Sequence, residues 1–195
     1  MRNIFIKKLI EKAKKNKNIY FLTADLGYSS FEIFKKKFPN RFINVGVAEN
    51  NMIGIAAGLA LLNKEVYVYS IVPFLVFRSL EQIRNNICNT NLNVKIMGGG
   101  GGFSYGNLGI SHNTSEDLSI MNTLPNLKVF APGLKNETEL MLDVMFKNVG
   151  PSYMRLGKIP NFNYNIKNSS YKIGNGILVN EGKDLIIISC GNILE

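Results

Sequence analysis

The sequence has few of the residues from which metal sites and disulfides are built. Its 195 residues include one histidine, His112, and two cysteines, Cys88 and Cys190. The two cysteines lie far apart and fit no CxxC or zinc-binding spacing, so we expect no metal ligands in this chain. Both thiols are expected to stay reduced, as they do in the cytoplasm.

The sequence also lacks a long apolar run. No stretch approaches the roughly 18 consecutive apolar residues that a membrane-spanning helix needs. The first segment, MRNIFIKKLIEKAKKNKN, has lysines throughout and no apolar region typical of a secretory signal. Its apolar residues, Ile6, Leu9, Ile10 and Ala13, recur with helical spacing and predict an amphipathic helix. We therefore expect a cytoplasmic protein with no membrane partner.

Acidic residues are outnumbered by basic ones, 14 against 23, which gives a formal net charge of +9. Such a charge fits either an anionic partner, such as nucleic acid or a phosphorylated small molecule, or a lysine-rich solvated surface. The basic residues are spread along the chain, and no nucleic-acid-binding motif accompanies them. The solvated surface is the favoured interpretation, and no nucleic-acid partner is expected.

Apolar segments alternate with helical patterns along the first 156 residues. The segments that read as strands are 19–25, 42–45, 65–71, 92–98, 127–132 and 152–156. The helical patterns lie at 30–37, 48–62, 73–89, 115–123 and 135–147. This alternation predicts an α/β fold, with a mostly parallel sheet covered by helices on both faces. Ligands of such sheets bind at the carboxyl ends of the strands.

The last part of the sequence has a different character. Residues 157–171 are polar and rich in asparagine, which is typical of a linker. Two strand-like segments follow, KIGNGILV and KDLIIISCG, but two strands cannot form an independent core. The sequence thus predicts one domain over 1–160 and, over 161–195, a linker with the first strands of an incomplete second domain.

One acidic residue, Glu49, stands in the apolar, glycine-rich stretch NVGVAENNMIGIAAGLA. A carboxylate in the first turn of a helix is favoured by the helix dipole, which is the ordinary explanation for it. However, Gly54 and Gly58 each cost helix stability and indicate that a neighbour approaches the backbone closely. A carboxylate entering such a crowded region needs a partner, and no nearby residue supplies one.

Two further features lie where strands are expected to end. In the 73–89 helix, Phe74 and Phe77 lie on the face opposite the core stripe, so they line either an interface or a ligand pocket. The loop MGGGGGFSYGNLGISHNTSED carries five successive glycines but no phosphate-binding motif. The loop reaches His112, which is either a proton shuttle or a surface residue. Thr114 or Ser115 is expected to cap the helix that follows.

Several motifs, taken in order, resemble the pyrimidine-binding domain of the transketolase family. They span roughly residues 1–160 and are MRNIF, TADLGYSS, RFINVGVAENNMIGIAAGLAL, PFLVFRSLEQIRNNI, GFSYGNLGISHNTSEDLSIMNTLPNLKVFAPG and GPSYMRLGK. The resemblance implies a subunit of an enzyme that uses thiamine diphosphate and transfers a two-carbon ketol unit between sugar phosphates. It also implies that the cofactor is bound between subunits.

The resemblance implies a role for each matching residue. In the family, the glutamate matching Glu49 hydrogen-bonds N1′ of the cofactor's pyrimidine ring and favours the imino tautomer that deprotonates the thiazolium. Phe74 and Phe77 match aromatic residues that pack on that ring, and Asp25 matches an aspartate near the thiazolium. His112 matches a histidine that contacts the reacting substrate. The positions that match residues holding the substrate phosphate are Arg2, Ser29 and Arg155.

The sequence also departs from the family pattern. Where the family has an aromatic residue, an acidic residue and a second histidine, this sequence has Leu80, Leu108 and Gly100. These differences weaken the inference about the substrate more than the inference that the chain binds the cofactor. The GDG…N motif that binds diphosphate and Mg²⁺ is absent, so those ligands are expected from a partner chain. The chain therefore resembles the carboxyl-side subunit of a split transketolase, with the family's third domain cut short, and is expected to homodimerise through the pyrimidine domain.

Three alternatives stay open on the sequence. Two share the cofactor: 1-deoxy-xylulose-5-phosphate synthase and the β subunit of a 2-oxo acid dehydrogenase. The third is a non-catalytic module that keeps the fold, for which Leu108 and Gly100 are the reasons.

Overall fold

The structure, a computed structural model, describes residues 1–158 and 173–191. Six strands form one parallel sheet in the order β2-β1-β3-β4-β6-β5. The strands are β1 (Ile19–Thr23), β2 (Phe42–Asn44), β3 (Glu65–Ile71), β4 (Val94–Gly99), β5 (Lys128–Phe130) and β6 (Ser152–Leu156). The α-helices are α1 (Arg2–Lys15), α2 (Glu32–Lys37), α3 (Glu49–Leu61), α4 (Val72–Gln82), α5 (Asp117–Asn122) and α6 (Lys135–Lys147). The predicted α/β fold with a parallel sheet is confirmed.

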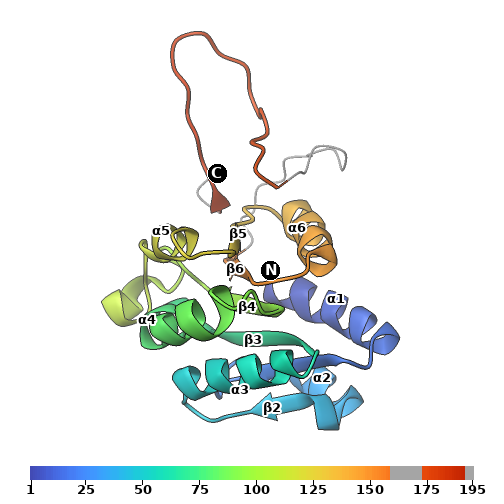
Figure 1. Ribbon diagram of the computed structural model, residues 1–195. Helices are drawn as coiled ribbons and strands as arrows, with labels where there is room; N and C mark the ends of the chain where they lie inside the picture. Colours follow the sequence, from blue (N-terminus) through green and yellow to red (C-terminus); the bar gives the residue numbers. More distant parts are fainter. Residues whose placement is uncertain (159–172, 192–195) are drawn as a thin grey trace.

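Helices cover both faces of the sheet, as Figure 1 shows. Side chains from β3 alternate between the two faces because successive residues of a strand point to opposite sides. Val66 and Val68 pack in a core with α3, α4 and α5. Tyr67 and Tyr69 pack in a second core with α1, α2 and α6. Burial on both faces explains why the strands read as continuous apolar segments. Among the described residues, none of the helices is both long and apolar enough to span a bilayer.

The predicted helix over 73–89 is one element in sequence but two in structure. α4 ends at Gln82 and continues as a π-helical turn from Ile83 to Cys88. Within α4, Ser79 leaves helical geometry, with φ −123° and ψ 18°, and its hydroxyl donates to the Leu75 carbonyl at 2.7 Å. A serine hydroxyl that bonds back to the preceding turn is a common cause of a bent helix. The bend turns the residues around Ser79 relative to the start of α4.

The described tail, 173–191, extends away from the sheet as a long loop (Figure 1). Residues 173–191 contain no strand and do not join the sheet, although the sequence predicts two strand-like segments in this region. Leu185, Ile186, Ile187 and Ile188 are all exposed. Most of the predicted linker lies outside the described residues, and the division at residue 160 stays a prediction.

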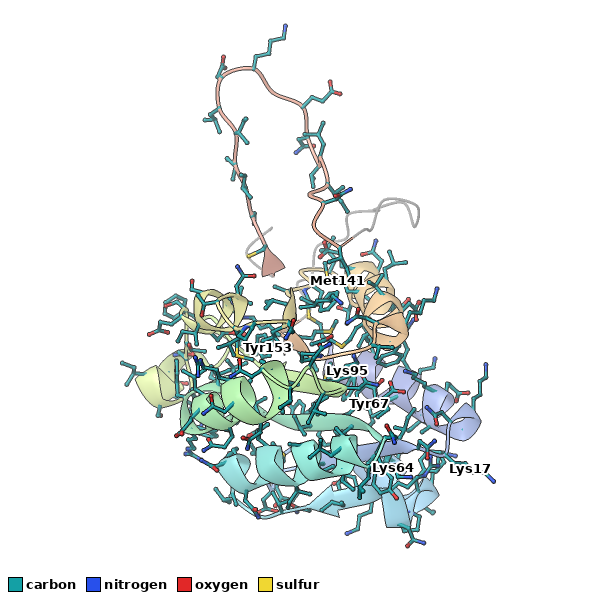
Figure 2. All side chains as sticks on the ribbon, in the orientation of Figure 1. Lys17, Lys64, Tyr67, Lys95, Met141 and Tyr153 are labelled. Atoms are coloured by element: carbon teal, nitrogen blue, oxygen red, sulfur yellow. The ribbon has the colours of Figure 1, made fainter. Side chains whose placement is uncertain are left out.

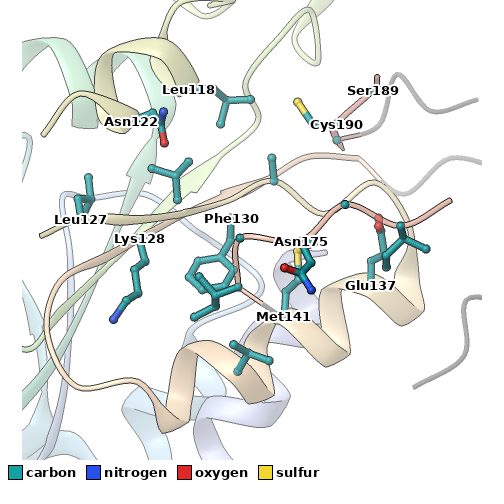
Figure 3. A pocket seen from close by; sticks show the side chains of 18 of the residues that line it. Leu118, Asn122, Leu127, Lys128, Phe130, Glu137, Met141, Asn175, Ser189 and Cys190 are labelled. Carbon is teal, nitrogen blue, oxygen red and sulfur yellow. The ribbon is translucent and has the colours of Figure 1, made fainter. Parts of the chain in front are cut away.

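A cavity of about 750 Å³ lies between the tail and the sheet edge at β5. Phe130 and Met141 line it together with Asn175 and Cys190 of the tail; Figure 3 shows Asn175 beside Phe130 and Met141, with Cys190 further away. None of the residues that the sequence predicts as a site lines this cavity. Its position beside an exposed apolar tail indicates a packing gap and not a catalytic pocket.

Lys95, on β4, is fully buried near the amino edge of the sheet, close to Tyr67 (Figure 2). Its ammonium group donates hydrogen bonds to the carbonyl oxygens of Asn148 and Gly150, at 2.7 and 2.6 Å, and so holds the turn between α6 and β6. Burial lowers the pKa of Lys95 to about 7; the Glu65 carboxylate opposes the shift, and two nearby lysines add to it. The amine can donate both hydrogen bonds in its neutral form.

We expect this burial to make stability depend on pH in one direction. Because the folded-state pKa of Lys95 is about 7 and the unfolded value is near 10.5, the unfolded chain binds more protons in this window. The free energy of unfolding should therefore rise by about 3 kcal/mol between pH 7 and pH 10 relative to a Lys95→Met variant. Urea denaturation of both proteins at the two pH values measures it. If the free energy of unfolding of the two proteins changed with pH in the same way, Lys95 would not be the cause of the pH dependence.

Candidate functional site

The carboxyl ends of all six strands lie at one edge of the sheet because the strands are parallel, and Glu49 lies there at the first position of α3. Its side chain is buried, with 2% of the residue exposed. One carboxylate oxygen accepts a hydrogen bond from the Ser70 hydroxyl at 3.1 Å, and the other accepts one from Nη1 of Arg78 at 2.9 Å. The helix N-terminus adds further positive potential. The carboxylate is thus buried and fully partnered.

The partner Arg78 lies on α4, one turn after Phe74. Its guanidinium carbon is 4.2 Å from the centre of the Phe74 ring, which is a cation–π contact. Residues i and i+4 share one face of a helix, so Arg78 can cover Phe74 while it reaches Glu49. The Arg78 side chain is 47% exposed, whereas that of Glu49 is 1% exposed. A half-exposed cation therefore neutralises a buried anion.

No residue near Glu49 in the sequence is its partner, as expected, but more distant parts of the chain do supply partners. Ser70 and Arg78 lie 21 and 29 residues away along the chain and meet Glu49 only after β3 and α4 have folded against α3. The signal that could have identified Arg78 is its position four residues after Phe74, on the helical face already singled out for its aromatic residues.

His112 lies beside Phe74. The two rings meet edge to face, with centroids 5.1 Å apart, and His112 makes a similar contact with Tyr105 at 5.7 Å. Nδ1 of the histidine is 2.9 Å from the Ser111 hydroxyl, which orients the ring. Arg78 bridges Glu49 to Phe74, and Phe74 contacts His112, so these residues form one cluster at the carboxyl edge of the sheet. The expected caps do not form: α5 begins at Asp117, after Glu116, without a side-chain cap.

The glycine loop explains one departure from the family pattern. Gly100 has a φ of +84°, and a Cβ added there would lie 2.3 Å from the Tyr105 ring. Position 100 therefore excludes a histidine side chain unless Tyr105 moves. Burial raises the pKa of Tyr105, which keeps its phenol protonated.

Phe77 is separated from this cluster. It is 45% exposed and lines a shallow groove on the outer side of α4 with Asn50, Arg78 and Glu81. The structure thus places the two predicted aromatic residues in different surroundings. Phe74 lies beside the catalytic candidates, and Phe77 lies at a surface.

Asp25 and Ser29 lie on the loop after β1, and both have a positive φ, 56° and 63°. The Asp25 carboxylate accepts hydrogen bonds from the Asn44 amide at 3.0 Å and from the Tyr28 hydroxyl at 2.8 Å. These two donors, Asn44 first, lower the pKa of Asp25. The Ser29 amide donates to Glu32 at 2.9 Å, and its side chain is exposed. Both residues are therefore presented on a turn at the carboxyl edge.

Two arginines flank this edge in contrasting ways. Arg2 is exposed at the start of α1. It lies close to Tyr69: burial raises the pKa of the Tyr69 hydroxyl, and the positive charge of Arg2 opposes that rise. Arg155 is buried, and its Nε and Nη2 both donate to the Asp117 carboxylate. The Tyr153 hydroxyl donates to the same carboxylate at 2.6 Å. At the carboxyl edge of the sheet, the guanidinium of Arg155 is therefore already paired with the Asp117 carboxylate.

The pairing of Arg155 with Asp117 should govern stability, because removing one partner leaves the other charge buried. We expect Asp117→Asn to lower the free energy of unfolding by about 3 kcal/mol. Tyr153→Phe, which deletes one donor to the same carboxylate, should cost about 1 kcal/mol. Urea denaturation checks both values. Equal effects of the two substitutions would contradict the charge pairing as the cause.

Metal ligands are not gathered anywhere in the described ranges. No three His, Cys, Asp or Glu side chains of residues 1–158 and 173–191 come together in a way that could hold an ion.

Comparison with known proteins decides the family. A family model described as "Transketolase, pyrimidine binding domain" matches residues 1–160. The chain belongs to the transketolase family. It is 39% identical to a "Putative transketolase C-terminal section" of Methanocaldococcus jannaschii over 194 residues, which cover 98% of this chain and 61% of the relative. A protein of Actinobacillus succinogenes, named as one of the subunits of an apulose-4-phosphate transketolase, is 36% identical over 157 residues, 80% of this chain and 50% of the relative.

A solved structure of the transketolase family has the same fold. It is described as "Split gene transketolase, inactive beta4 tetramer" and superposes with a TM-score of 0.79 at 36% sequence identity. The match covers 94% of this chain and 59% of that one. The chain therefore spans about three fifths or less of the length of each of these three transketolase relatives.

Proposed function

We propose that this chain is a subunit of a thiamine-diphosphate-dependent transketolase that transfers a two-carbon ketol unit between sugar phosphates. It supplies the pyrimidine side of the active site. The observation that carries this proposal is the cluster of Glu49, Phe74 and His112 at the carboxyl edge of the sheet. It combines a buried carboxylate, an aromatic face and a titratable ring in one place.

The residues present fit an aminopyrimidine ring. Glu49 would hold N1′ of the ring by a hydrogen bond, because its carboxylate is fixed by Ser70 and by the start of α3. Phe74 would provide the flat apolar surface for the ring, and Asp25 would lie toward the thiazolium. Thiamine diphosphate, when bound, supplies the carbon nucleophile and the electron sink that ketol transfer requires.

His112 and the arginines would receive the substrate. His112 lies against Phe74 with Nδ1 occupied by Ser111, so its Nε2 is the atom that would exchange a proton or a hydrogen bond with a sugar hydroxyl. The phosphate end of the sugar would be held by Arg2, Ser29 and Arg155. Arg155 is already paired with Asp117, so its Nη1 is the nitrogen with the most capacity left, and Arg2 contributes the more exposed charge.

A second chain is needed to complete this site. The sequence lacks the family's diphosphate and magnesium motif, so a partner that has this motif would supply those ligands. Two copies of the chain would also pair through α3. Gly54 and Gly58 both lie on the exposed face of this helix, where an added Cβ would meet nothing within 4 Å. The tetramer described for the split-gene relative supports self-association.

A second candidate is a non-catalytic module of the same fold. It is favoured by the contact of Arg78 with Glu49 and by the replacement of family side chains at Leu108 and Gly100. The alternatives with the same cofactor, 1-deoxy-xylulose-5-phosphate synthase and a 2-oxo acid dehydrogenase β subunit, differ in the acceptor or donor they use. A single variant separates catalysis from the non-catalytic module.

We expect Glu49→Gln to lower kcat for ketol transfer by at least about 100-fold, because an amide cannot take the carboxyl group's part in proton movement at the ring. The assay uses this chain reconstituted with a partner that carries the GDG motif, thiamine diphosphate and Mg²⁺. Glu11→Gln, at an exposed carboxylate on α1 that pairs with Lys14, is the matched control and should retain full activity. Ketol transfer that survives Glu49→Gln, or that this chain performs unaccompanied, would refute the proposal.

The double substitution Gly54→Ala and Gly58→Ala tests the pairing of α3. In the free chain alanine fits at both positions, and each should stabilise the helix by about 1 kcal/mol. The added methyl groups should weaken self-association, because they keep the two helices apart. Sedimentation velocity measures the assembly, and thermal denaturation measures the stability. A variant that is stabilised and still assembles like the wild type would place the interface elsewhere.

A further inference from the structure

Arg78 makes the two contacts that the aminopyrimidine ring would make. It donates a hydrogen bond to the Glu49 carboxylate at 2.9 Å, and its planar guanidinium stacks on Phe74 with 4.2 Å between its central carbon and the ring centre. A guanidinium and an aminopyrimidine are both flat and nitrogen-rich, and both can satisfy a carboxylate while covering an aromatic face. Arg78 and the ring therefore compete for the same two side chains.

We propose that Arg78 is a displaceable counter-ion: it occupies Glu49 and Phe74 in the free chain and swings away when the aminopyrimidine enters. This inference rests on the proposed function, because the competing ring is that of thiamine diphosphate. Before the cofactor arrives, the buried Glu49 carboxylate would be costly with only the Ser70 hydroxyl beside it and no opposite charge. Arg78 provides that partner from within the chain.

The surroundings of Arg78 permit the movement. Its side chain is nearly half exposed, so only its tip has to leave the carboxylate. Beside it lies the shallow groove on the outer side of α4, lined among others by Asn50, Phe77 and Glu81. Glu81 follows Arg78 by three residues, a spacing at which opposite charges on a helix attract. The groove thus offers the released guanidinium both space and an anion.

The counter-ion reduces the apparent affinity for the cofactor. Molecules in which Arg78 holds Glu49 cannot bind the ring, and the apparent dissociation constant rises in inverse proportion to the competent fraction. If the pair is formed in about nine of ten molecules, its removal should tighten binding about tenfold. The same removal should destabilise the free chain, because it leaves the buried Glu49 carboxylate without an opposite charge and with the Ser70 hydroxyl as its remaining side-chain partner.

The experiment compares Arg78→Met with Arg84→Met. Arg84 is an exposed arginine that lines the same groove and donates its side-chain hydrogen bond to Asn85, so it is the matched control. Thiamine diphosphate binding, with Mg²⁺ and the reconstituted partner, is measured by isothermal titration calorimetry. Thermal unfolding of the full chain without cofactor is measured in parallel. We expect Arg78→Met to bind about tenfold more tightly than wild type and to unfold at a lower temperature, and Arg84→Met to change neither.

A Glu49→Gln background completes the test. There the neutral amide gives Arg78 no charge to hold, so adding Arg78→Met should no longer tighten binding or lower the unfolding temperature. Suppose that the wild type binds the cofactor in a way that depends on Glu49, but Arg78→Met alone binds it no more tightly. That result would overturn the counter-ion proposal and leave the proposed function intact. Failure of wild type to bind thiamine diphosphate would overturn both.

Discussion

The site depends on one constraint: a carboxylate removed from water has to be paired. Glu49 meets this constraint through three elements at once, since α3 provides the helix N-terminus, β3 provides Ser70 and α4 provides Arg78. These contacts hold the amino end of α3 against the carboxyl end of β3 and against α4. The same arrangement brings Phe74 and His112 to the carboxylate, because Phe74 shares a helical face with Arg78. The contacts that neutralise Glu49 are therefore the same contacts that pack this edge of the sheet.

Most of the fold could be predicted from the sequence, because burial on both faces leaves a strong apolar signal in each strand. The ends of β3 and β6 lie where the sequence places them, and the ends of the remaining strands differ from the predicted ones by at most two residues. The break after Gln82 could not be predicted, since a hydrogen bond from Ser79 and a π-helical turn leave the apolar spacing of the helix nearly unchanged. In the tail, composition alone predicts strands, but a strand also needs a neighbour.

The sequence identifies the residues of the candidate site, but it does not show which side chains pair with them. Glu49, Phe74 and His112 follow strands whose carboxyl ends meet, so their proximity follows from the topology. Arg78 with Glu49 and Asp117 with Arg155 are pairs separated by 29 and 38 residues, and only the packed chain reveals them. Asp117 reads in the sequence as an ordinary residue of a helix start. In the structure it neutralises a buried arginine that also serves as a candidate phosphate ligand.

The glycine at position 100 has a consequence for any attempt to engineer this loop. A designer who restores the family histidine there would place its side chain against the ring of Tyr105, on a backbone conformation that only glycine adopts at low cost. The two positions are therefore linked, and the order of changes matters: position 105 has to become smaller before position 100 can grow. A library that varies the two sites together would reach folded proteins that single-site screening misses.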